Sequence, residues 1–202
     1  MLEYFPDVKF YKSFSNFKEI EEEKKSLKEI AICGRSNSGK SSLINVLCNQ
    51  KQLAYVSSFA GKTKTINYYF VPSYKSYYKN FFLVDLPGFG FAEVSKEKKN
   101  QMIQLLDEYL EKSKKLALLI LIVDAKRKLE EEEKSILAYC KDFNKDFLIV
   151  KSKWDRFNQK EKNQILKEWK ENEELFNKTI FVSSLKKYNI KILISQIIEY
   201  VK

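Results

Sequence analysis

The stretch GRSNSGKSS, residues 34–42, decides the fold of this chain. Its first eight residues match the pattern GxxxxGK[ST], in which glycines let the backbone wrap around phosphate groups. The match follows an apolar run, EIAIC at 29–33, and precedes a stretch with helical spacing, SSLINVLC at 41–48. Strand, loop and helix in this order form the context in which the pattern is meaningful. The sequence therefore predicts a P-loop, whose backbone N–H groups and helix N-terminus bind phosphate.

Short apolar runs recur along the chain, each of strand length and rich in β-branched or aromatic residues. They lie at 29–33, 66–71, 80–85, 116–124, 146–150 and 179–183. Between most of them lie stretches with helical spacing, at 41–48, 95–113, 130–143, 159–176 and 189–202. Strands that alternate with helices predict a parallel sheet covered on both faces. We therefore expect an α/β fold of the P-loop NTPase kind, a three-layer αβα sandwich.

One pair of runs breaks the alternation. The runs at 66–71 and 80–85 are separated by only a short turn-like segment, which favours an antiparallel hairpin. We expect a mostly parallel six-stranded sheet with one antiparallel edge strand. The aromatic residues of this hairpin are interpreted as packing residues rather than as a base-stacking platform.

Length and composition set further limits. The chain has 202 residues, 44% of them hydrophobic, which suits one domain with a real core. We expect a single domain over 1–202, with 1–28 as an N-terminal extension, and a monomer. No run approaches the roughly 18 uncharged residues of a membrane span, and no secretory signal is visible, so we expect a cytoplasmic protein with no membrane partner. Three cysteines without paired spacing are interpreted as buried thiols.

The charged residues indicate the kind of partner, and the lack of histidine excludes several kinds of catalytic site. Lys plus Arg number 37 against 27 Asp plus Glu, a net charge of +10 that favours polyanionic partners such as RNA. The chain has no histidine, which excludes Ser/His/Asp triads, Cys/His pairs and His-ligated zinc. Any catalysis must therefore proceed without imidazole.

The phosphate site can be extended from the P-loop. Lys40 is expected to bridge the outer phosphates, and the Ser41 hydroxyl to ligate Mg²⁺ directly. Asp85 ends the run at 80–85 and would emerge beside the P-loop, where it holds Mg²⁺ through water. The Gly88 N–H would meet the γ-phosphate. The segment SSFAGKTKT, 57–65, suits a loop that senses this phosphate and supplies a direct Mg²⁺ ligand, with Thr63 preferred.

Thr65 is the alternative to Thr63 in that role. Together with Lys40 and Gly88, Thr63 is expected to act at the reacting phosphate.

The element Ser152-Lys153-Trp154-Asp155 distinguishes between purines. It resembles the [NT]KxD motif, in which the carboxylate accepts two hydrogen bonds from guanine. Adenine would leave this carboxylate unpaired, at a cost of several kcal/mol. Ser152 stands in place of the usual Asn or Thr and keeps a hydroxyl that can tie this loop to the P-loop. The lysine stem would lie over the base, and the SSL segment after 182 resembles the SAK element that meets guanine O6.

These motifs define the residues expected to bind GTP or GDP. They are Gly34, Arg35, Ser36, Asn37, Ser38, Gly39, Lys40, Ser41, Ser42, Gly61, Lys62, Thr63, Lys64, Thr65, Asp85, Leu86, Pro87, Gly88, Ser152, Lys153, Trp154, Asp155, Val182, Ser183 and Ser184.

The motifs together resemble a known family. GRSNSGKSSLIN, GKTKTIN, DLPGFGFA, SKWD and FVSSLKK are similar to the EngB/YihA/YsxC group of bacterial ribosome-biogenesis GTPases, of the TrmE-Era-EngA-EngB type, from about residue 29 onward. Where that family commonly has Gly after the last motif, this chain has Asn189, which tolerates a left-handed conformation. The resemblance implies a GTP-hydrolysing switch in assembly of the large (50S) ribosomal subunit, with rRNA or ribosomal protein as partner and a link to cell division and septation.

The catalytic apparatus departs from that of Ras-like proteins. Phe89 occupies the position where they carry a Gln that orients the attacking water. We therefore expect slow intrinsic hydrolysis with Mg²⁺ as cofactor. Asn37 resembles the Asn with which related GTPases bind K⁺ beside the phosphates, so K⁺ is a candidate second cofactor that raises the rate, as is a ribosomal partner.

Two other functions stay open at this stage. A kinase would use the same P-loop but usually needs an Arg-rich lid, which the sequence does not show. In the other alternative the chain is an RNA-binding assembly factor in which the nucleotide is mainly structural. Its contacts would be Lys96, Lys98, Lys99, Lys112, Lys114, Lys115, Lys126, Arg127, Lys128, Lys186 and Lys187.

Overall fold

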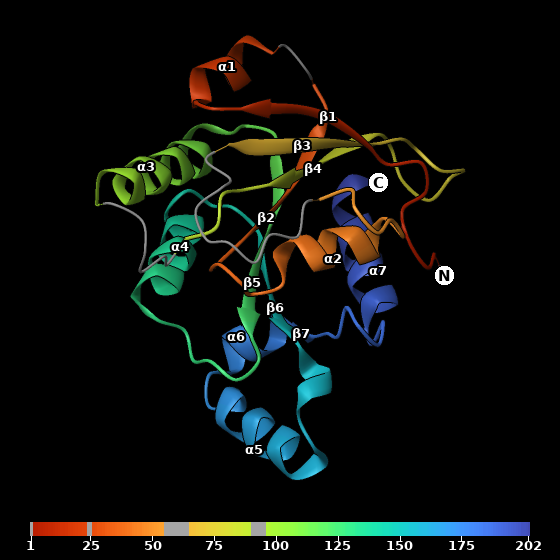
Figure 1. The fold of residues 1–202 in the computed structure, drawn as a ribbon, viewed down its shortest axis with the longest axis vertical. Helices are drawn as coiled ribbons and strands as arrows, with labels where there is room; N and C mark the ends of the chain where they lie inside the picture. Colours follow the sequence, from red (N-terminus) through yellow and green to blue (C-terminus); the bar gives the residue numbers. More distant parts are fainter. Residues whose placement is uncertain (1, 24–25, 55–64, 90–95) are drawn as a thin grey trace.

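The computed structural model describes residues 2–23, 26–54, 65–89 and 96–202. Within them one sheet of seven strands has the order β1-β3-β4-β2-β5-β6-β7 (Figure 1). The strands are β1 (Lys9–Phe14), β2 (Lys28–Gly34), β3 (Ile66–Val71), β4 (Phe81–Asp85), β5 (Leu116–Asp124), β6 (Phe147–Ser152) and β7 (Thr179–Phe181). The predicted α/β fold with a mostly parallel sheet is confirmed.

The sheet differs from the prediction at one edge. Six strands were expected, with the antiparallel one outermost. Strand β3 is indeed antiparallel to β4, but β1 pairs with β3 and forms the edge instead. β1 comes from the segment expected to be an extension, and its sequence KFYKSF lacks an apolar run because most of its side chains are exposed. The pairing covers the backbone groups of β3 that would otherwise form an open edge.

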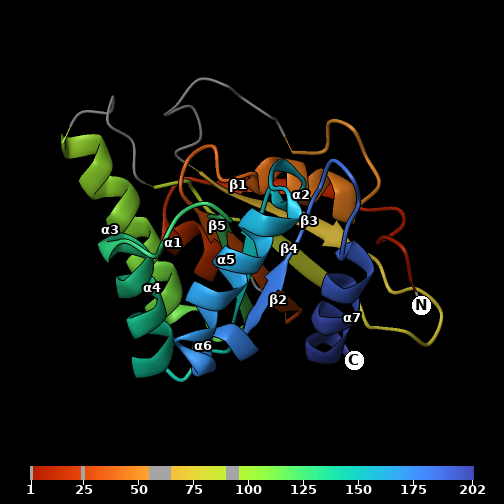
Figure 2. The same ribbon diagram turned by 90° about the horizontal axis from the view of Figure 1, so that it is seen from below.

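Helices cover both faces of the sheet, as Figure 2 shows. They are α1 (Phe17–Glu22), α2 (Lys40–Leu47), α3 (Lys96–Lys112), α4 (Glu131–Asp142), α5 (Gln159–Lys170), α6 (Glu173–Asn177) and α7 (Ile190–Val201). Alternation along β2 decides which face each side chain joins: Ile30 and Ile32 pack with α2 and α7, whereas Ala31 and Cys33 pack with α3 and α4. The result is the predicted three-layer sandwich.

The helical stretch predicted at 159–176 is two helices. α5 ends at Lys170, and α6 begins after Asn172, whose side chain accepts a hydrogen bond from the Leu175 N–H. An Asn at this position caps a new helix start, which explains the break. Both helices pack on a small third core with Trp154 and Phe181, beside β6 and β7.

Two smaller features complete the fold. Among the described residues, none of the helices combines the length and apolar character needed to cross a membrane. Cys33, Cys48 and Cys140 are buried free thiols, as expected, and burial raises the pKa of Cys48 to about 12.

Candidate nucleotide-binding site

The P-loop joins β2 to α2 in a conformation that requires its glycines. Gly39 precedes the helix with φ of 101°, a left-handed conformation that side chains disfavour. A Cβ on Gly34 would lie 2.5 Å from the Ile122 carbonyl oxygen of the neighbouring strand β5. The loop therefore lies tightly against the sheet, and the N-terminus of α2 is left to face outward with its backbone N–H groups.

Two buried serine hydroxyls of this loop lack hydrogen-bond partners among the described residues. Within the described part of the chain, the Oγ atoms of Ser36 and Ser38 are buried and have no hydrogen-bond partner. Buried polar groups in folded proteins nearly always have partners, so an orphaned pair indicates that something else satisfies them. A phosphate bound in the loop fits these donors.

The loop after β4 is fastened to the P-loop. The Ser36 N–H donates to the Phe89 carbonyl at 3.0 Å, and the Phe89 N–H donates to the Gly34 carbonyl at 3.4 Å. These bonds place Gly88 against the P-loop, where its Cβ position lies 3.3 Å from Ser36 Oγ. The Phe89 side chain is buried in the core on the α3 and α4 face. Phe89 therefore does not present a water-orienting group to the site.

The end of β4 brings a carboxylate to the same place. Asp85 is buried, and its Oδ1 accepts a charged hydrogen bond from Lys40 Nζ in the first turn of α2. Ser41 follows Lys40 in that turn. A hydroxyl, a carboxylate and phosphate oxygens form the hard oxygen set that Mg²⁺ prefers, so these residues fit the predicted metal.

The segment after β6 is tied to the P-loop by two side chains. Ser152 Oγ donates to the Ser38 carbonyl at 2.5 Å, which is the tie predicted from its hydroxyl. Lys153 Nζ donates to the Asn37 carbonyl at 2.6 Å and pairs with Asp124 Oδ2 at 2.9 Å. Burial acts to raise the pKa of Asp124, but the hydrogen bond and charge of Lys153 outweigh it and lower that pKa. The segment after β6 and the P-loop thus form one connected unit.

Asp155 is positioned by the last loop of the sheet. Asp155 lies in the short 3₁₀ helix Trp154–Arg156 that follows β6. Its Oδ1 accepts a hydrogen bond from Ser183 Oγ, and the same Ser183 oxygen accepts one from the Lys186 N–H at 2.9 Å. The Trp154 N–H donates to the Val182 carbonyl at 3.0 Å and holds the two loops together. Asn189 adopts the left-handed conformation anticipated for it, with φ of 57°.

Some residues around the site were not anticipated from the sequence. Arg35, itself an expected site residue, is paired through Nη1 with Glu130 at 2.7 Å, Glu132 at 3.1 Å and Glu133 at 3.5 Å, at the start of α4, and these three partners were missed. Asp124 was missed too, although a charged residue that ends an apolar strand of a parallel sheet is a usable signal. The glutamates carried no comparable signal, because acidic residues are ordinary in a first helical turn.

Part of the predicted switch lies outside the described residues. Gly61, Lys62, Thr63 and Lys64 fall in the gap at 55–64. The side chains of Lys96, Lys98 and Lys99, expected RNA contacts in the alternative function, also lie outside the described part of the chain. Thr65 is described, and its hydroxyl donates to the Asn67 side chain at 3.2 Å.

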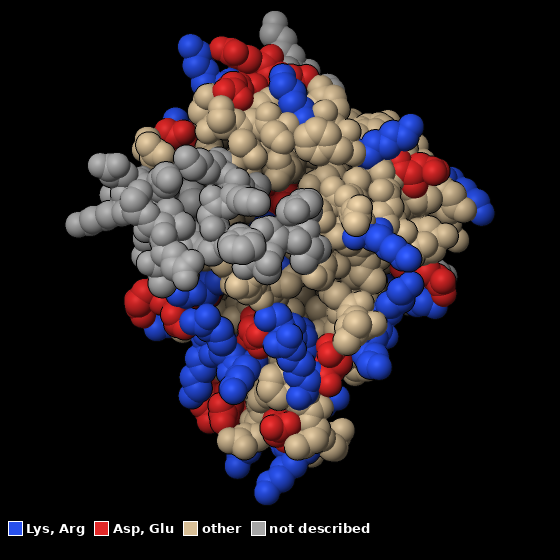
Figure 3. Space-filling model, in the orientation of Figure 1, with Lys and Arg blue, Asp and Glu red and all other residues tan. Residues whose placement is uncertain are grey.

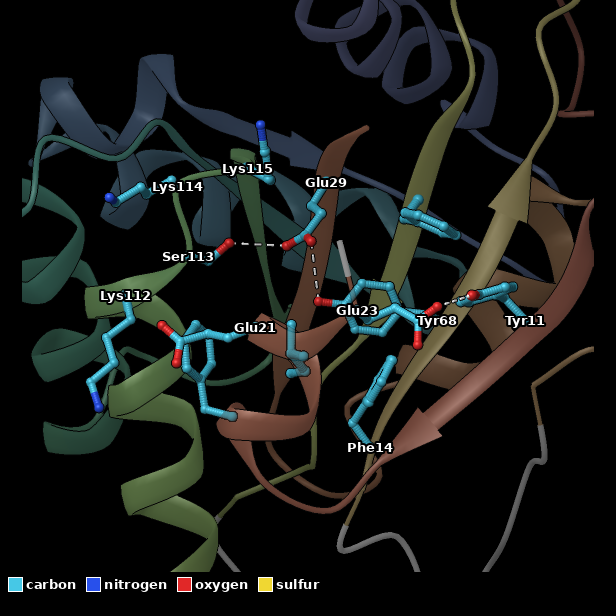
Figure 4. A pocket seen from close by; sticks show the side chains of 13 residues that line it. Tyr11, Phe14, Glu21, Glu23, Glu29, Tyr68, Lys112, Ser113, Lys114 and Lys115 are labelled. Carbon is cyan, nitrogen blue, oxygen red and sulfur yellow. Dashed lines mark hydrogen bonds between the residues drawn. The ribbon is translucent and has the colours of Figure 1, made fainter. Parts of the chain in front are cut away.

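A separate cavity of about 300 Å³ lies at the other end of the sheet (Figure 4). Glu29 is buried there and accepts hydrogen bonds from Tyr109 at 2.7 Å, Ser113 at 3.0 Å and Tyr68 at 3.2 Å. Burial raises the pKa of Glu29. Three internal donors satisfy this carboxylate, so we interpret it as a structural tie between β2, β3 and α3.

The fold and the loops described above define a P-loop GTPase: a P-loop after β2, an acidic residue at the end of β4 and a second carboxylate, Asp155, after β6. A model of the 50S ribosome-binding GTPase family matches residues 29–153. The chain is 37% identical over 152 residues to the probable GTP-binding protein EngB of Lactobacillus helveticus, covering 75% of this chain and 74% of the relative. It is 40% identical over 184 residues to that of Mycoplasmopsis synoviae, covering 90% and 93%.

Solved structures agree on the fold. Era from Aquifex aeolicus, bound to GDP and AlF4⁻, superposes with a TM-score of 0.71 at 22% identity, over 88% of this chain and 58% of Era. A probable GTP-binding protein EngB superposes with a TM-score of 0.63 at 21% identity, over 85% of this chain and 97% of the other. The chain belongs to the EngB family of GTP-binding proteins.

Proposed function

We propose that this GTPase acts as a monomeric, single-domain switch in assembly of the large ribosomal subunit in the cytoplasm. Membership of a 50S ribosome-binding family and the net charge of +10 support a ribosomal partner. The observation that carries the nucleotide part is the pair of hydrogen bonds from Ser152 and Lys153 to the P-loop backbone. They hold the purine carboxylate at a fixed distance from the phosphate loop, as a guanine nucleotide requires.

Each site residue has a role in this proposal. The P-loop backbone and Lys40 hold the phosphates, with the Ser36 and Ser38 hydroxyls as additional donors. Asp155, oriented by Ser183, accepts from guanine N1–H and the 2-amino group. The Ser183 N–H already donates to the Tyr188 carbonyl at 3.2 Å, so we assign the contact with guanine O6 to the Ser184 N–H.

Mg²⁺ would be held by Ser41, Thr63 and, through water, Asp85. Bound there, Mg²⁺ would neutralise charge on the outer phosphates. Lys40 contacts Asp85, so we infer that the lysine turns toward the phosphates when the metal takes its place beside the carboxylate.

Hydrolysis is expected to be slow, because Phe89 is buried and carries no group that orients water. We propose that K⁺ at Asn37, or the ribosomal partner, raises the rate. The test compares GTP hydrolysis in KCl and in NaCl, each with and without 50S subunits. We expect faster turnover with K⁺ or with subunits; equal rates under all four conditions would contradict the proposal.

Nucleotide and ribosome binding are tested separately. Calorimetric titration with GTP, GDP and ATP in Mg²⁺ buffer should show uptake of the guanine nucleotides and none of ATP. Co-sedimentation with 50S subunits should depend on GTP rather than GDP. Co-sedimentation that is identical with GTP, GDP and no nucleotide would leave an RNA-binding factor with a structural nucleotide as the better description.

A further inference from the structure

A cavity of about 480 Å³ lies beside the nucleotide site, between the loop at 125–129, the start of α4 and the helices α5 and α6. Five of its lining residues are Lys or Arg and two are Glu: Lys126, Arg127, Lys128, Lys134 and Lys151 against Glu168 and Glu171. Figure 3 shows Lys and Arg side chains gathered over this part of the molecule. The volume lies in the range of sites that take small organic ligands.

A buried lysine that forms no direct ion pair with any described residue lies in the wall of this cavity. Lys151 is 1% exposed, and its Nζ donates to the Arg127 carbonyl and lies 3.8 Å from the centre of the Trp169 ring. In the described part of the chain no carboxylate lies within 4.0 Å of this ammonium, and Asp124 and Glu133 act on it only from farther away. Burial lowers the pKa of Lys151 to about 8. A buried charge of this kind normally has an ionic partner, so an anion is the group that the site lacks.

Part of the cavity lining is apolar. Leu129, Ile165 and Trp169 line the cavity together with its Lys and Arg residues. Cations at the rim, a buried ammonium and a flat aromatic side chain are the elements with which proteins hold single-stranded nucleic acid, by contacts to the phosphates and by packing against the base.

We propose that this cavity binds a nucleotide of a single-stranded RNA, with its phosphate at Lys151 and the rim lysines and its base against the apolar wall. The site is distinct from the GTP site, although Arg127 lines it and also lines a small cavity against the P-loop residues Arg35 to Ser38. Arg127 also pairs with Glu130, which pairs with Arg35 of the P-loop. A chain of ion pairs, from Arg127 through Glu130 to Arg35, would therefore connect a bound RNA strand with the loop that binds the phosphates of GTP.

The test measures binding of a fluorescein-labelled hexauridylate by anisotropy, with excess GDP present to fill the guanine site. The variants are Lys126→Glu with Lys128→Glu, both exposed, and separately Lys151→Met, which removes the charge and keeps much of the bulk. The matched control is Lys9→Glu with Lys18→Glu, exposed lysines of β1 and α1 far from the cavity. The control makes the same change in net charge as the double variant.

We expect both cavity variants to bind the RNA at least about tenfold more weakly than the control. The dependence of log K on log salt should flatten by about 0.7 for each RNA phosphate that the variant no longer neutralises. Equal weakening in the cavity and control variants would overturn the proposal, because it would show attraction to overall charge only. Unlabelled uridine monophosphate or polyglutamate that competes as well as unlabelled hexauridylate would overturn the RNA assignment.

The proposal stands apart from the function proposed above. GDP affinity, measured by calorimetry on the same variants, should stay within about twofold of the unsubstituted chain. Loss of RNA binding with GDP affinity intact supports a separate site, whereas parallel loss of both would place the effect on the nucleotide site and overturn the proposal.

Discussion

Two buried carboxylates stand at opposite ends of neighbouring strands, and they are used in different ways. Glu29, near the start of β2, is satisfied by three neutral hydroxyls from the surrounding elements. Asp85, at the end of β4, contacts the ammonium of Lys40, the lysine of the P-loop, in which two buried serine hydroxyls have no hydrogen-bond partner among the described residues. An acid whose partners are all internal and neutral serves the fold. An acid beside a movable cation and unpaired donors marks a place for a charged ligand.

The largest expected effect concerns the nucleotide site, where we expect Asp155 to bind the guanine base. Asp155→Asn should weaken GTP binding by a factor of thousands, because the amide cannot accept both guanine donors. The same variant should prefer xanthosine triphosphate, whose 2-oxo group accepts from the new amide. Calorimetry with both nucleotides measures the switch; unchanged GTP affinity would remove the assignment of the base.

Asp85→Asn addresses the metal at the same end. We expect the Mg²⁺ concentration needed for GTP hydrolysis to rise about 10- to 100-fold, since an outer-sphere carboxylate is replaced by a neutral amide. The measurement is a Mg²⁺ titration of the hydrolysis rate. An unaltered Mg²⁺ dependence would show that Asp85 takes no part in holding the ion.

A matched pair of glycines tests how tightly the phosphate loop is packed. Gly34→Ala should destabilise the fold by about 1 to 3 kcal/mol or more, because the new methyl meets a backbone carbonyl at 2.5 Å. Gly88→Ala should cost less, since its nearest neighbour is a serine hydroxyl at 3.3 Å. Urea unfolding of both variants gives the comparison, and equal losses would contradict the tighter packing at Gly34.

The smallest effect is expected at the structural end. Glu29→Gln should leave GTP affinity unchanged and alter stability on the order of 1 kcal/mol. The raised pKa of Glu29 means that the folded state binds its proton more tightly than the unfolded state. The contribution of Glu29 to stability is therefore greatest below its unfolded pKa and falls as pH rises through the folded pKa.

Urea unfolding at pH 4.5 and pH 7 measures this dependence. The unsubstituted chain should lose stability relative to Glu29→Gln as the pH rises, and the opposite slope would show that the carboxylate is stabilised by its donors more than burial penalises it.

The sequence predicted those parts that depend on local pattern. Apolar runs gave the strands from β2 to β7, and the run at 66–71 coincides with β3. β1 was not predicted because its sequence, KFYKSF, mixes two lysines and a serine with aromatic residues and therefore shows no apolar run, and most of its side chains are exposed. The break at Asn172 was hidden inside a continuous helical pattern. The long-range ties from Ser152 and Lys153 to the P-loop and the pairing of Arg35 depend on the packing of distant loops, and only the Ser152 tie was anticipated.

Arg35 has a consequence for how turnover is controlled. Its guanidinium forms ion pairs with three glutamates at the start of α4, so its positive charge is already compensated within the molecule. Together with a core-facing Phe89, this leaves the phosphate loop with no spare arginine of its own to stabilise charge as the bond to the γ-phosphate breaks. Under the function proposed above, such an enzyme would act as a timer that K⁺ or a ribosomal partner starts, and its rate would report whether that activator is present.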